Sequence, residues 1–521
     1  MLMKELPSSY VITQDTRALF ERINQAELSG DFLVAVERYF DKLQTIISSS
    51  LDSNVALTAY EETDIEKRVS DAVRTEIRSD PTTYCICLDR FLLSDVAEEF
   101  PERFFRFSVT RTIDGNKVPR SRDPSFPKQI KNLLQTIPEA NTKPAILVDD
   151  GIFSGGTVQD MVQMLRSSGT PIKVKSVIGF IGSTDKQNGA TILEPVENLY
   201  EWVDMRDFTP LGGKTVSTSK NNRIASAAPY LYPWSLGEGA SFDTSPTLFT
   251  MSRGAILGFQ ELVRSFEQQY GRPLRFRELV KAGFTLPVST VDKDDLVVSL
   301  NDRVIDYLNR CIQKINKEQR RTVCLFDMDG TLYRLDGVGS GYAGSSLEKR
   351  VRNNATAFIA AQENCSFDQA NVVYESGIAD RIGLSSYLSR RYDISRSDYF
   401  DTVWNIDPSP IVEQYEIPVR VLRELKQSTV KPVLLTSAPR VWMKRVLETL
   451  EIDNVFELTY SGEQFGTKSE IFARLAGWYT PTNIISIGDQ EQTDIAPAKA
   501  YGFRTLLVSS PADVQNLLEA I

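Results

Sequence analysis

The chain has 521 residues, 41% of them hydrophobic and 25% charged, which at about 150 residues per domain indicates a globular protein of three or four domains. The formal net charge of -10 argues against general binding to nucleic acids or anionic membranes. The chain contains no histidine, which excludes Ser-His-Asp and Cys-His nucleophile systems, HExxH metalloproteases and haem sites with a histidine ligand. Any catalysis must therefore use carboxylates, Lys, Arg, hydroxyls, backbone amides or a metal that prefers oxygen ligands.

The cysteines and the N-terminus indicate a cellular location. The five cysteines are odd in number and irregularly spaced, which is typical of small buried side chains in a reducing compartment. The N-terminus lacks the apolar core of a signal peptide, and no apolar run reaches the roughly 18 residues of a membrane helix. We therefore expect a cytoplasmic protein that does not contact a membrane.

The hydrophobic pattern divides the chain into four regions. Apolar residues recur at helical spacing through residues 1–80, which predicts an N-terminal helical region. Residues 81–235 alternate short apolar strands with helices, residues 236–321 favour a helical connector, and residues 322–521 form a second alternating region. The candidate strands of the first alternating region are Thr83–Leu88, Phe104–Val109, Ala145–Val148, Val174–Ile181 and Leu199–Val203. The pattern predicts an α/β protein with two Rossmann-like parallel-sheet domains joined by helical segments.

A candidate phosphate site follows the third of these strands. The strand ends in Asp149 and Asp150, and a loop of small residues then leads into a helix. Glycines let backbone N–H groups approach an anion, and the N-terminus of the helix adds its positive end. The two carboxylates at the strand tip can accept hydrogen bonds from sugar hydroxyls. A phosphate beside vicinal hydroxyls is a ribose 5-phosphate, so this pattern favours a phosphorylated ribose as the ligand.

The segment ILVDDGIFSGGT resembles the signature of type I phosphoribosyltransferases, which binds 5-phosphoribosyl-1-pyrophosphate (PRPP). The resemblance implies that Asp149 and Asp150 hold the ribose hydroxyls. It implies a 5-phosphate cradle made of Ser154, Gly155, Gly156 and Thr157. The basic loop that begins at Arg111 stands where the family has a mobile flap over pyrophosphate. The fifth strand ends in Trp202-Val203-Asp204-Met205-Arg206-Asp207-Phe208, where the family contacts the acceptor; an aromatic side chain there could stack on a base or pack in the core.

One departure concerns the loop after the first strand, where the family has small residues that bind pyrophosphate. Here the segment is Leu88-Asp89-Arg90-Phe91-Leu92, without glycine, although Arg90 could still contact a pyrophosphate. The sequence therefore leaves open whether this domain transfers a phosphoribosyl group or only senses PRPP or a nucleotide.

A second set of polar residues follows apolar runs in the C-terminal region. Asp327 and Asp329 end one such run, and two residues that are two apart at a strand tip face the same side. Two close carboxylates can divide the roles of nucleophile and proton carrier between them. Further polar positions follow other apolar runs or begin a helix: Thr436, Lys468, Asp489 and Asp494.

In this order the four segments resemble the motifs of the haloacid dehalogenase (HAD) superfamily of phosphohydrolases over about residues 322–521. The resemblance implies that Asp327 attacks phosphorus to form an aspartyl phosphate, and that Asp329 protonates the leaving oxygen and then activates water. It implies that Thr436 and Lys468 hold the phosphoryl oxygens. Mg²⁺ would be bound by Asp327, the carbonyl of Asp329, Asp489 and, in support, Asp494.

Residues 337–418 are mostly helical in pattern and stand where a C1 cap of this superfamily closes over substrate. The Thr-Leu-Tyr after the first motif and a helical cap are similar to pyrimidine 5′-nucleotidases, which gives a lead on substrate.

Two functions remain open. The chain is either a bifunctional enzyme of nucleotide metabolism or a phosphatase regulated by a PRPP or nucleotide sensor. The second alternative could serve bacterial stress or phage defence, because both domains resemble those encoded near tellurium-resistance-type stress genes. The expected partners are phosphorylated small molecules such as PRPP and nucleotides, and the oligomeric state stays open.

Overall fold

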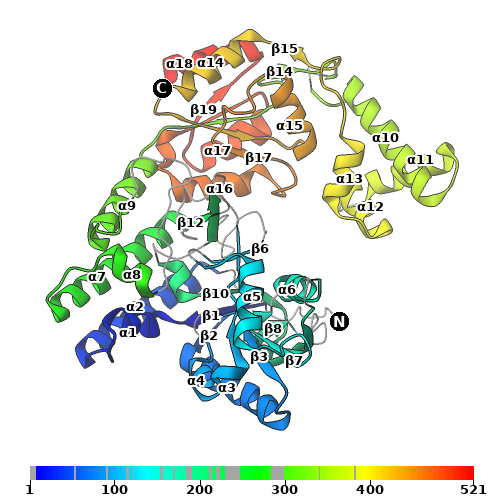
Figure 1. Cartoon of the computed structure of the whole chain (residues 1–521). Coiled ribbons are helices and arrows are strands. Elements are labelled where there is room, and N and C mark those ends of the chain that lie inside the picture. The colour runs from blue at the N-terminus through cyan, green and yellow to red at the C-terminus, as the bar shows by residue number, and fades with distance from the viewer. Residues whose placement is uncertain are drawn as a thin grey trace. The chain divides into compact units, whose positions relative to one another are not determined.

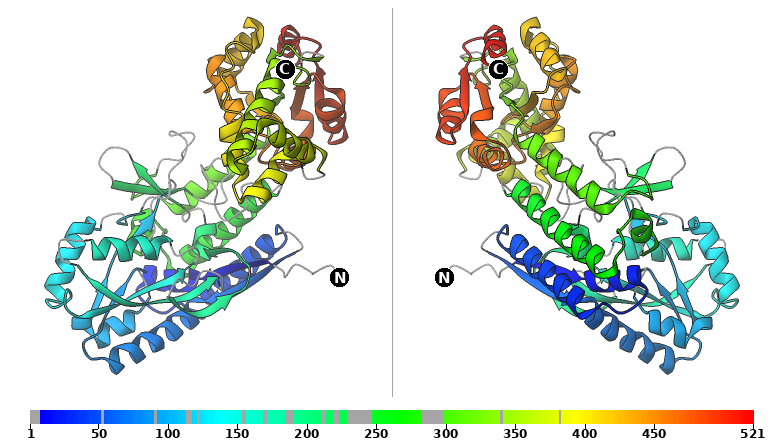
Figure 2. Two further views of the ribbon diagram at one scale, coloured as in Figure 1. Left: turned by 90° about the vertical axis from the view of Figure 1, so that its right-hand side faces the viewer. Right: turned by 90° about the vertical axis from the view of Figure 1, so that its left-hand side faces the viewer.

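A computed structural model of the chain forms two compact units, Met1–Ile315 and Asn316–Ile521, which we call the N-terminal and C-terminal units (Figures 1 and 2). The structure describes residues 8–51, 54–89, 92–112, 117–120, 123–152, 156–167, 171–183, 190–209, 214–218, 223–228, 247–282, 298–338, 341–380 and 383–521. Both units contain parallel sheets with helices, which confirms the predicted α/β class.

The N-terminal unit contains a five-stranded parallel sheet in the order β4-β3-β7-β8-β9. These strands span Phe104–Arg106, Tyr84–Cys87, Pro144–Ile152, Lys173–Ser183 and Ala190–Val196, respectively. The two strands of this sheet that follow β3 in the chain, β4 and then β7, lie on opposite sides of β3. The loops after β3 and β7 therefore diverge, and a crevice at the carboxyl edge is expected between them.

Helices cover both faces of this sheet. Because side chains alternate along a strand, Cys85 and Cys87 point to one face while Tyr84 and Ile86 point to the other. The first face packs against α3 (Glu62–Ser79), and the second packs against α5 (Phe126–Thr136) and α6 (Gly156–Arg166). All four of these strand residues are fully buried, so the cysteines are core side chains, as their spacing indicated.

The prediction that residues 1–80 are helical is wrong for two segments. β1 (Ser8–Gln14) and β2 (Val55–Glu61) pair in parallel, and β10 (Leu199–Asp204) joins β1 to complete a three-stranded sheet. β1 is the central strand and buries five residues in a row, and so short an apolar run cannot be told from a helix by its period. Helices α1 (Thr16–Asn24) and α2 (Gly30–Ser48) account for the helical spacing between these strands.

The predicted fifth strand of the first sheet is also corrected. Leu199–Val203 forms β10 and pairs with β1, while β9 takes the fifth place in the five-stranded sheet. β9 is an edge strand that contains Glu194 and Pro195. Proline is tolerated at a sheet edge but argues against a strand in the sequence, which explains why β9 was missed.

The remaining N-terminal elements in the described part of the chain are two antiparallel strand pairs and four further helices. Helix α7 packs along α2 around rings that include Phe20, Phe32 and Phe266. The elements are β5 (Thr110–Arg111), β6 (Lys117–Val118), β11 (Lys214–Thr218), β12 (Arg223–Ala228), α4 (Ser94–Glu99), α7 (Leu248–Tyr270), α8 (Phe276–Ala282) and α9 (Val304–Gln319). The predicted helical connector contains α7, α8 and α9, and the boundary between the units falls within α9.

The C-terminal unit contains a second five-stranded parallel sheet, in the order β17-β16-β13-β18-β19. These strands span Leu458–Tyr460, Lys431–Leu435, Val323–Phe326, Ile484–Gly488 and Arg504–Leu507. β13 is central and fully buried, and β16 and β18 pair with it on either side. The residues that follow these three strands therefore meet at one edge, at the switch in strand order.

Four helices are inserted after β13. β14 (Tyr333–Arg334) and β15 (Glu413–Gln414) pair antiparallel where the chain enters and leaves this insert (Figure 1). The inserted helices are α10 (Ser346–Glu363), α11 (Phe367–Ala379), α12 (Leu384–Tyr392) and α13 (Arg396–Val403). The other helices of the unit are α14 (Glu416–Lys426), α15 (Arg440–Thr449), α16 (Lys468–Trp478), α17 (Ala496–Ala500) and α18 (Leu517–Ala520). Among the described helices, none combines the length and the apolar character that crossing a membrane requires.

Candidate active site

The carboxyl edge of the C-terminal sheet gathers residues from three strands. Asp327 directly follows β13, and its backbone N–H donates to the carbonyl of Ile487 on β18 at 2.8 Å. Thr436 directly follows β16, is 1% exposed, and donates its backbone N–H to Tyr460 on β17 at 2.9 Å. These bonds continue the sheet beyond the strand ends, so both residues are held on a rigid support.

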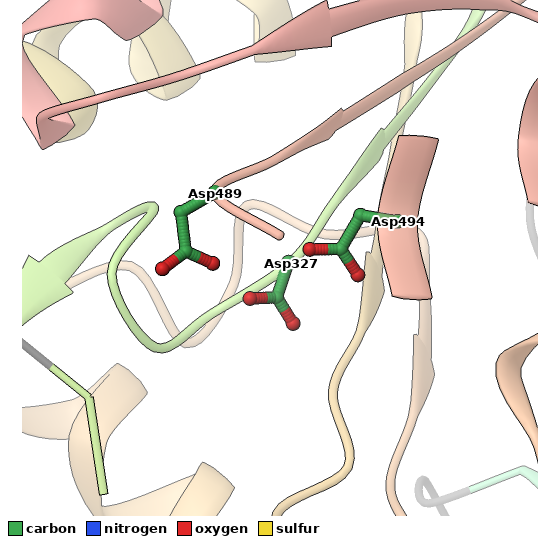
Figure 3. Close-up of side chains that lie close together, drawn as sticks. All are labelled: Asp327, Asp489 and Asp494. Carbon is green, nitrogen blue, oxygen red and sulfur yellow. The ribbon is translucent and has the colours of Figure 1, made fainter. Parts of the chain in front are cut away.

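Three carboxylates converge at this edge (Figure 3). Oxygens of Asp327, Asp489 and Asp494 all lie within 4.8 Å of one another. Asp489 follows β18, and Asp494 lies in a single turn of π-helix, Glu491–Ile495. The burial of Asp327 at 7% exposure and Asp494 at 2% exposure makes their mutual repulsion costly unless a positive charge lies nearby.

Two glycines allow the carboxylates to come this close. A Cβ atom on Gly330 would lie 2.1 Å from Oδ2 of Asp489, and one on Gly488 would lie 2.3 Å from Oδ2 of Asp494. Gly330 also has a φ of +77°, a conformation that side chains with a Cβ rarely adopt. The glycine after Asp329 is therefore required both by the turn and by the position of Asp489.

Lys468 places one positive charge among the three carboxylates. It begins α16, and its Nζ lies 2.5 Å from Oδ1 of Asp327 and 2.6 Å from Oδ1 of Asp494. One ammonium leaves the cluster with a net negative charge. Oδ1 of Asp489 is also buried without a hydrogen-bond partner among the described residues. The charge deficit, the orphaned oxygen and the all-oxygen donor set fit a divalent cation such as Mg²⁺.

The pKa values in the cluster are set by two effects, burial of the side chains and the charges of their neighbours. Burial raises the pKa of Asp327 to about 7, with Lys468 acting to lower it and Asp494 to raise it. Burial, together with Asp494, raises the pKa of Asp489 to about 6. Burial disfavours the charge of Lys468, but Asp327 and Asp494 outweigh that effect and raise its pKa. An ionised Asp327 therefore depends on the positive charge beside it.

Asp329 has one hydrogen-bond partner, Tyr333, that sequence reasoning missed, and Trp442 in turn bonds to that partner. The hydroxyl of Tyr333 donates to Oδ1 of Asp329, and Nε1 of Trp442 donates to the hydroxyl of Tyr333 at 3.1 Å. Burial raises the pKa of Asp329, and the bond from Tyr333 opposes that rise. The available signal was a tyrosine four residues after Asp329, beyond a glycine that permits a tight turn.

Of the residues that the sequence singled out here, Asp327, Lys468, Asp489 and Asp494 lie together. Thr436 lies at the same edge, where its Oγ1 accepts a hydrogen bond from the N–H of Ala438 at 3.1 Å. The roles drawn from the resemblance stay predictions for all of these residues and for Asp329.

The candidate site of the N-terminal unit lies at the carboxyl edge of its five-stranded sheet. Asp149 and Asp150 lie near the end of β7, and Gly156 and Thr157 begin α6. Burial and the charge of Asp89 raise the pKa of Asp149 to about 6, and burial with Asp149 raises that of Asp150. Ser154, Gly155 and Arg90 lie outside the described residues, as does the side chain of Arg111, whose backbone is in β5.

A partly buried ion-pair network adjoins this site at the ends of β1 and β10. Arg206 contacts Oδ2 of Asp204 at 2.5 Å and Oδ2 of Asp15 at 3.2 Å. Asp204 and Arg206 interact electrostatically with Asp150, so the carboxyl ends of both sheets of the unit contribute to one charged region. Asp15 was missed because β1 was not recognised as a strand, so its position at a strand end gave no signal.

Comparison with known proteins assigns part of the chain. The family model for haloacid dehalogenase-like hydrolases matches residues 322–502, so the C-terminal unit carries a HAD-like hydrolase domain. Solved structures that are similar include a hydrolase from Streptococcus pneumoniae TIGR4, with 14% identity, a TM-score of 0.22, and coverage of 38% of this chain and 99% of that chain. A protein from Haemophilus somnus 129pt that is predicted to be a phosphoglycolate phosphatase has 17% identity, a TM-score of 0.25, and coverage of 38% and 98%. No curated protein matches the chain in sequence.

Proposed function

We propose that the C-terminal unit is a Mg²⁺-dependent phosphohydrolase that works through an aspartyl phosphate on Asp327. The observation that carries this proposal is the buried cluster in which Lys468 contacts Asp327 at 2.5 Å while a carboxylate oxygen of Asp489 remains without a partner among the described residues. A nucleophilic carboxylate, a fixed ammonium and a vacant oxygen ligand are the groups that phosphoryl transfer needs at one point.

Each group has a distinct role in the proposed reaction. An oxygen of Asp327 attacks phosphorus, the bond from phosphorus to the ester oxygen breaks, and Asp329 gives its proton to that oxygen. Asp329 then takes a proton from the water that attacks the aspartyl phosphate, which releases phosphate and regenerates the carboxylate of Asp327 and the protonated form of Asp329. Lys468 and Thr436 hold the phosphoryl oxygens.

The metal would be held by Asp327, the backbone carbonyl of Asp329, Asp489 and Asp494. When bound it neutralises charge on the phosphoryl oxygens. The inserted helices α10–α13 lie between β14 and β15 and are the proposed cap, which would select a nucleotide or sugar phosphate. A 5′-nucleotidase activity remains part of this proposal.

A screen of phosphate esters with Mg²⁺ tests the hydrolase proposal, with Asp327→Asn as the inactive control. The proposal predicts phosphate release by the wild type that is lost in D327N and in the presence of a chelator. The absence of hydrolysis for every nucleotide and sugar phosphate, or a D327N variant as active as the wild type, would refute it. The preferred ester would also identify the substrate class.

We further propose that the N-terminal unit binds PRPP or a related ribose phosphate. In support, Asp149 and Asp150 lie at the switch in strand order, beside a helix that begins at Gly156. Whether the unit transfers the phosphoribosyl group or senses the ligand for the phosphatase depends on the loop that contains Arg90. Incubation with PRPP and a panel of bases separates these alternatives, because transfer releases pyrophosphate whereas a sensor binds PRPP without releasing it.

A further inference from the structure

We propose that Tyr333 is a positioning residue that orients the carboxylate of Asp329 for proton transfer, and that Trp442 fixes the hydroxyl of Tyr333. The proposal rests on the phosphohydrolase function proposed above, and it concerns two side chains to which the family resemblance gives no role. Both side chains are fully buried in the C-terminal unit.

The backbone brings Tyr333 back over Asp329. The N–H of Gly330 donates to the carbonyl of Tyr333 at 2.9 Å, and Asp329 and Tyr333 form an isolated bridge. The left-handed conformation of Gly330 closes this turn. The turn leaves the phenol ring of Tyr333 buried with its hydroxyl on Oδ1 of Asp329. The contact is therefore built into the loop and does not depend on a surface side chain that can move.

The direction of the hydrogen bonds follows from their chemistry. An indole N–H can only donate, so the hydroxyl oxygen of Tyr333 accepts from Trp442. The single hydroxyl proton of Tyr333 is then free to donate to Oδ1 of Asp329. Because Trp442 lies on α15, directly after the loop that contains Thr436, the orientation of Asp329 is supported by two separate segments of the site.

This direction determines which oxygen of Asp329 exchanges protons. Oδ1 is occupied as an acceptor, so Oδ2 is the oxygen that carries the proton. In the first step the proton on Oδ2 passes to the ester oxygen as its bond to phosphorus breaks. In the second step Oδ2 takes a proton from the attacking water. Tyr333 keeps its own proton throughout, so it acts on the reaction only through the orientation of Asp329.

Removing the hydroxyl by Tyr333→Phe tests this role with two aryl esters of similar shape. Phenyl phosphate has a more basic leaving group than p-nitrophenyl phosphate and so depends more on proton donation. Since general acid catalysis contributes about 10²–10⁴-fold, we expect Y333F to lower kcat/KM for phenyl phosphate about 10-fold and for p-nitrophenyl phosphate by less than about 2-fold. The ratio kcat/KM is the right measure because it reports only the steps up to the aspartyl phosphate.

The matched control is Tyr479→Phe. Tyr479 is also a buried tyrosine of this unit, 4% exposed, and its hydroxyl also contacts a carboxylate, Oε1 of Glu318 at 3.3 Å. It precedes β18 and so lies toward the amino edge of the sheet, away from Asp327. We expect Y479F to leave both esters unchanged. Adding Y333F to an Asp329→Asn variant should cause no further loss, because the group that it orients can no longer donate a proton.

The outcomes separate the positioning role from the function on which it rests. An equal loss on both esters, no loss on either, or a further loss in the D329N background would refute the positioning role. An inactive wild type, or an active D327N, would refute the phosphohydrolase and the positioning role together. Crystal structures of wild type and Y333F add a readout besides activity: we expect the Asp329 carboxylate to turn from its place, and an unchanged carboxylate would overturn the proposal.

Discussion

Replacing Lys468 by methionine should destabilise the C-terminal unit strongly. Its Nζ contacts Asp327 at 2.5 Å and Asp494 at 2.6 Å, and its side chain is 9% exposed. Removing one partner of a buried ion pair costs about 3–5 kcal/mol, because the remaining charges stay buried without compensation. About 1 kcal/mol lowers the Tm of a unit of this size by roughly 2–4 °C, so the expected loss is about 6–20 °C for the metal-free protein.

The loss should depend on pH in a defined direction. Burial already raises the pKa of Asp327 to about 7, well above its value in the unfolded chain, and removing Lys468 raises it further. A group whose pKa is raised by folding contributes stability at low pH that is lost as pH rises through the raised value. K468M should therefore lose more stability at pH 8 than at pH 6, which thermal unfolding at the two pH values measures.

Lys431→Met is the matched control. Lys431 is also buried, and its Nζ lies 2.7 Å from Oε1 of Glu318, which also contacts Arg321. K431M should lose stability as well, but Mg²⁺ should not restore it, whereas Mg²⁺ should restore part of the stability of K468M. A K468M variant with wild-type Tm at pH 8, or a loss that neither pH nor Mg²⁺ changes, would show that the electrostatic account of this cluster is wrong.

Three further predictions concern metal and ligand binding. Asp489→Asn should weaken Mg²⁺ binding by at least about 10–100-fold, the loss that follows when a residue hydrogen-bonded to a metal ligand is mutated. Titration calorimetry at constant pH measures this, and an unchanged affinity would contradict the prediction. Gly330→Ala should lower both Tm and Mg²⁺ affinity, because the added Cβ would lie 2.1 Å from Oδ2 of Asp489. Gly383→Ala is the control: Gly383 has the same φ of +77° but open space around it, so this substitution should lower Tm through backbone strain and leave Mg²⁺ affinity unchanged. Asp149→Asn should weaken PRPP binding. Because the pKa of Asp149 is raised to about 6, wild-type affinity should fall as pH drops below that value, and an equally steep fall in D149N would exclude Asp149 as its source.

Much of the C-terminal site could be predicted because its residues follow buried parallel strands. Asp327, Thr436 and Asp489 each end an apolar run, and such strand ends meet at one edge of a sheet. The position of Lys468 at the start of a helix was also visible in the sequence. What the sequence could not indicate was that Lys468 contacts both Asp327 and Asp494, because that depends on how α16 packs.

The contacts of Asp329 were beyond sequence reasoning for a different reason. Tyr333 reaches Asp329 through a tight turn at Gly330, and Trp442 reaches Tyr333 from a helix more than a hundred residues away. A pattern of strand ends says nothing about side chains that meet through a turn or from a distant helix. Tyr333 was therefore noted only as part of the Thr-Leu-Tyr segment that gave a lead on substrate, and Trp442 was not considered.

In the N-terminal unit two of the missed strands, β1 and β9, lie at opposite extremes of burial. β1 is so buried that it shows no alternation, whereas β9 lies at an edge and contains Pro195. Both depart from the alternating pattern that makes a half-buried strand recognisable. The missed β1 removed Asp15 from consideration, although it lies at a strand end beside Arg206. The PRPP-binding role and the cytoplasmic location stay predictions.

The central claim is that Asp327 becomes phosphorylated during turnover. Rapid acid quenching of the protein during hydrolysis of its preferred ester, followed by mass spectrometry of its peptides, measures this directly. The account predicts one added phosphoryl group on the peptide that contains Asp327, sensitive to hydroxylamine, and none in D327N. Sustained hydrolysis with no phosphoryl group on that peptide at any quench time would contradict it.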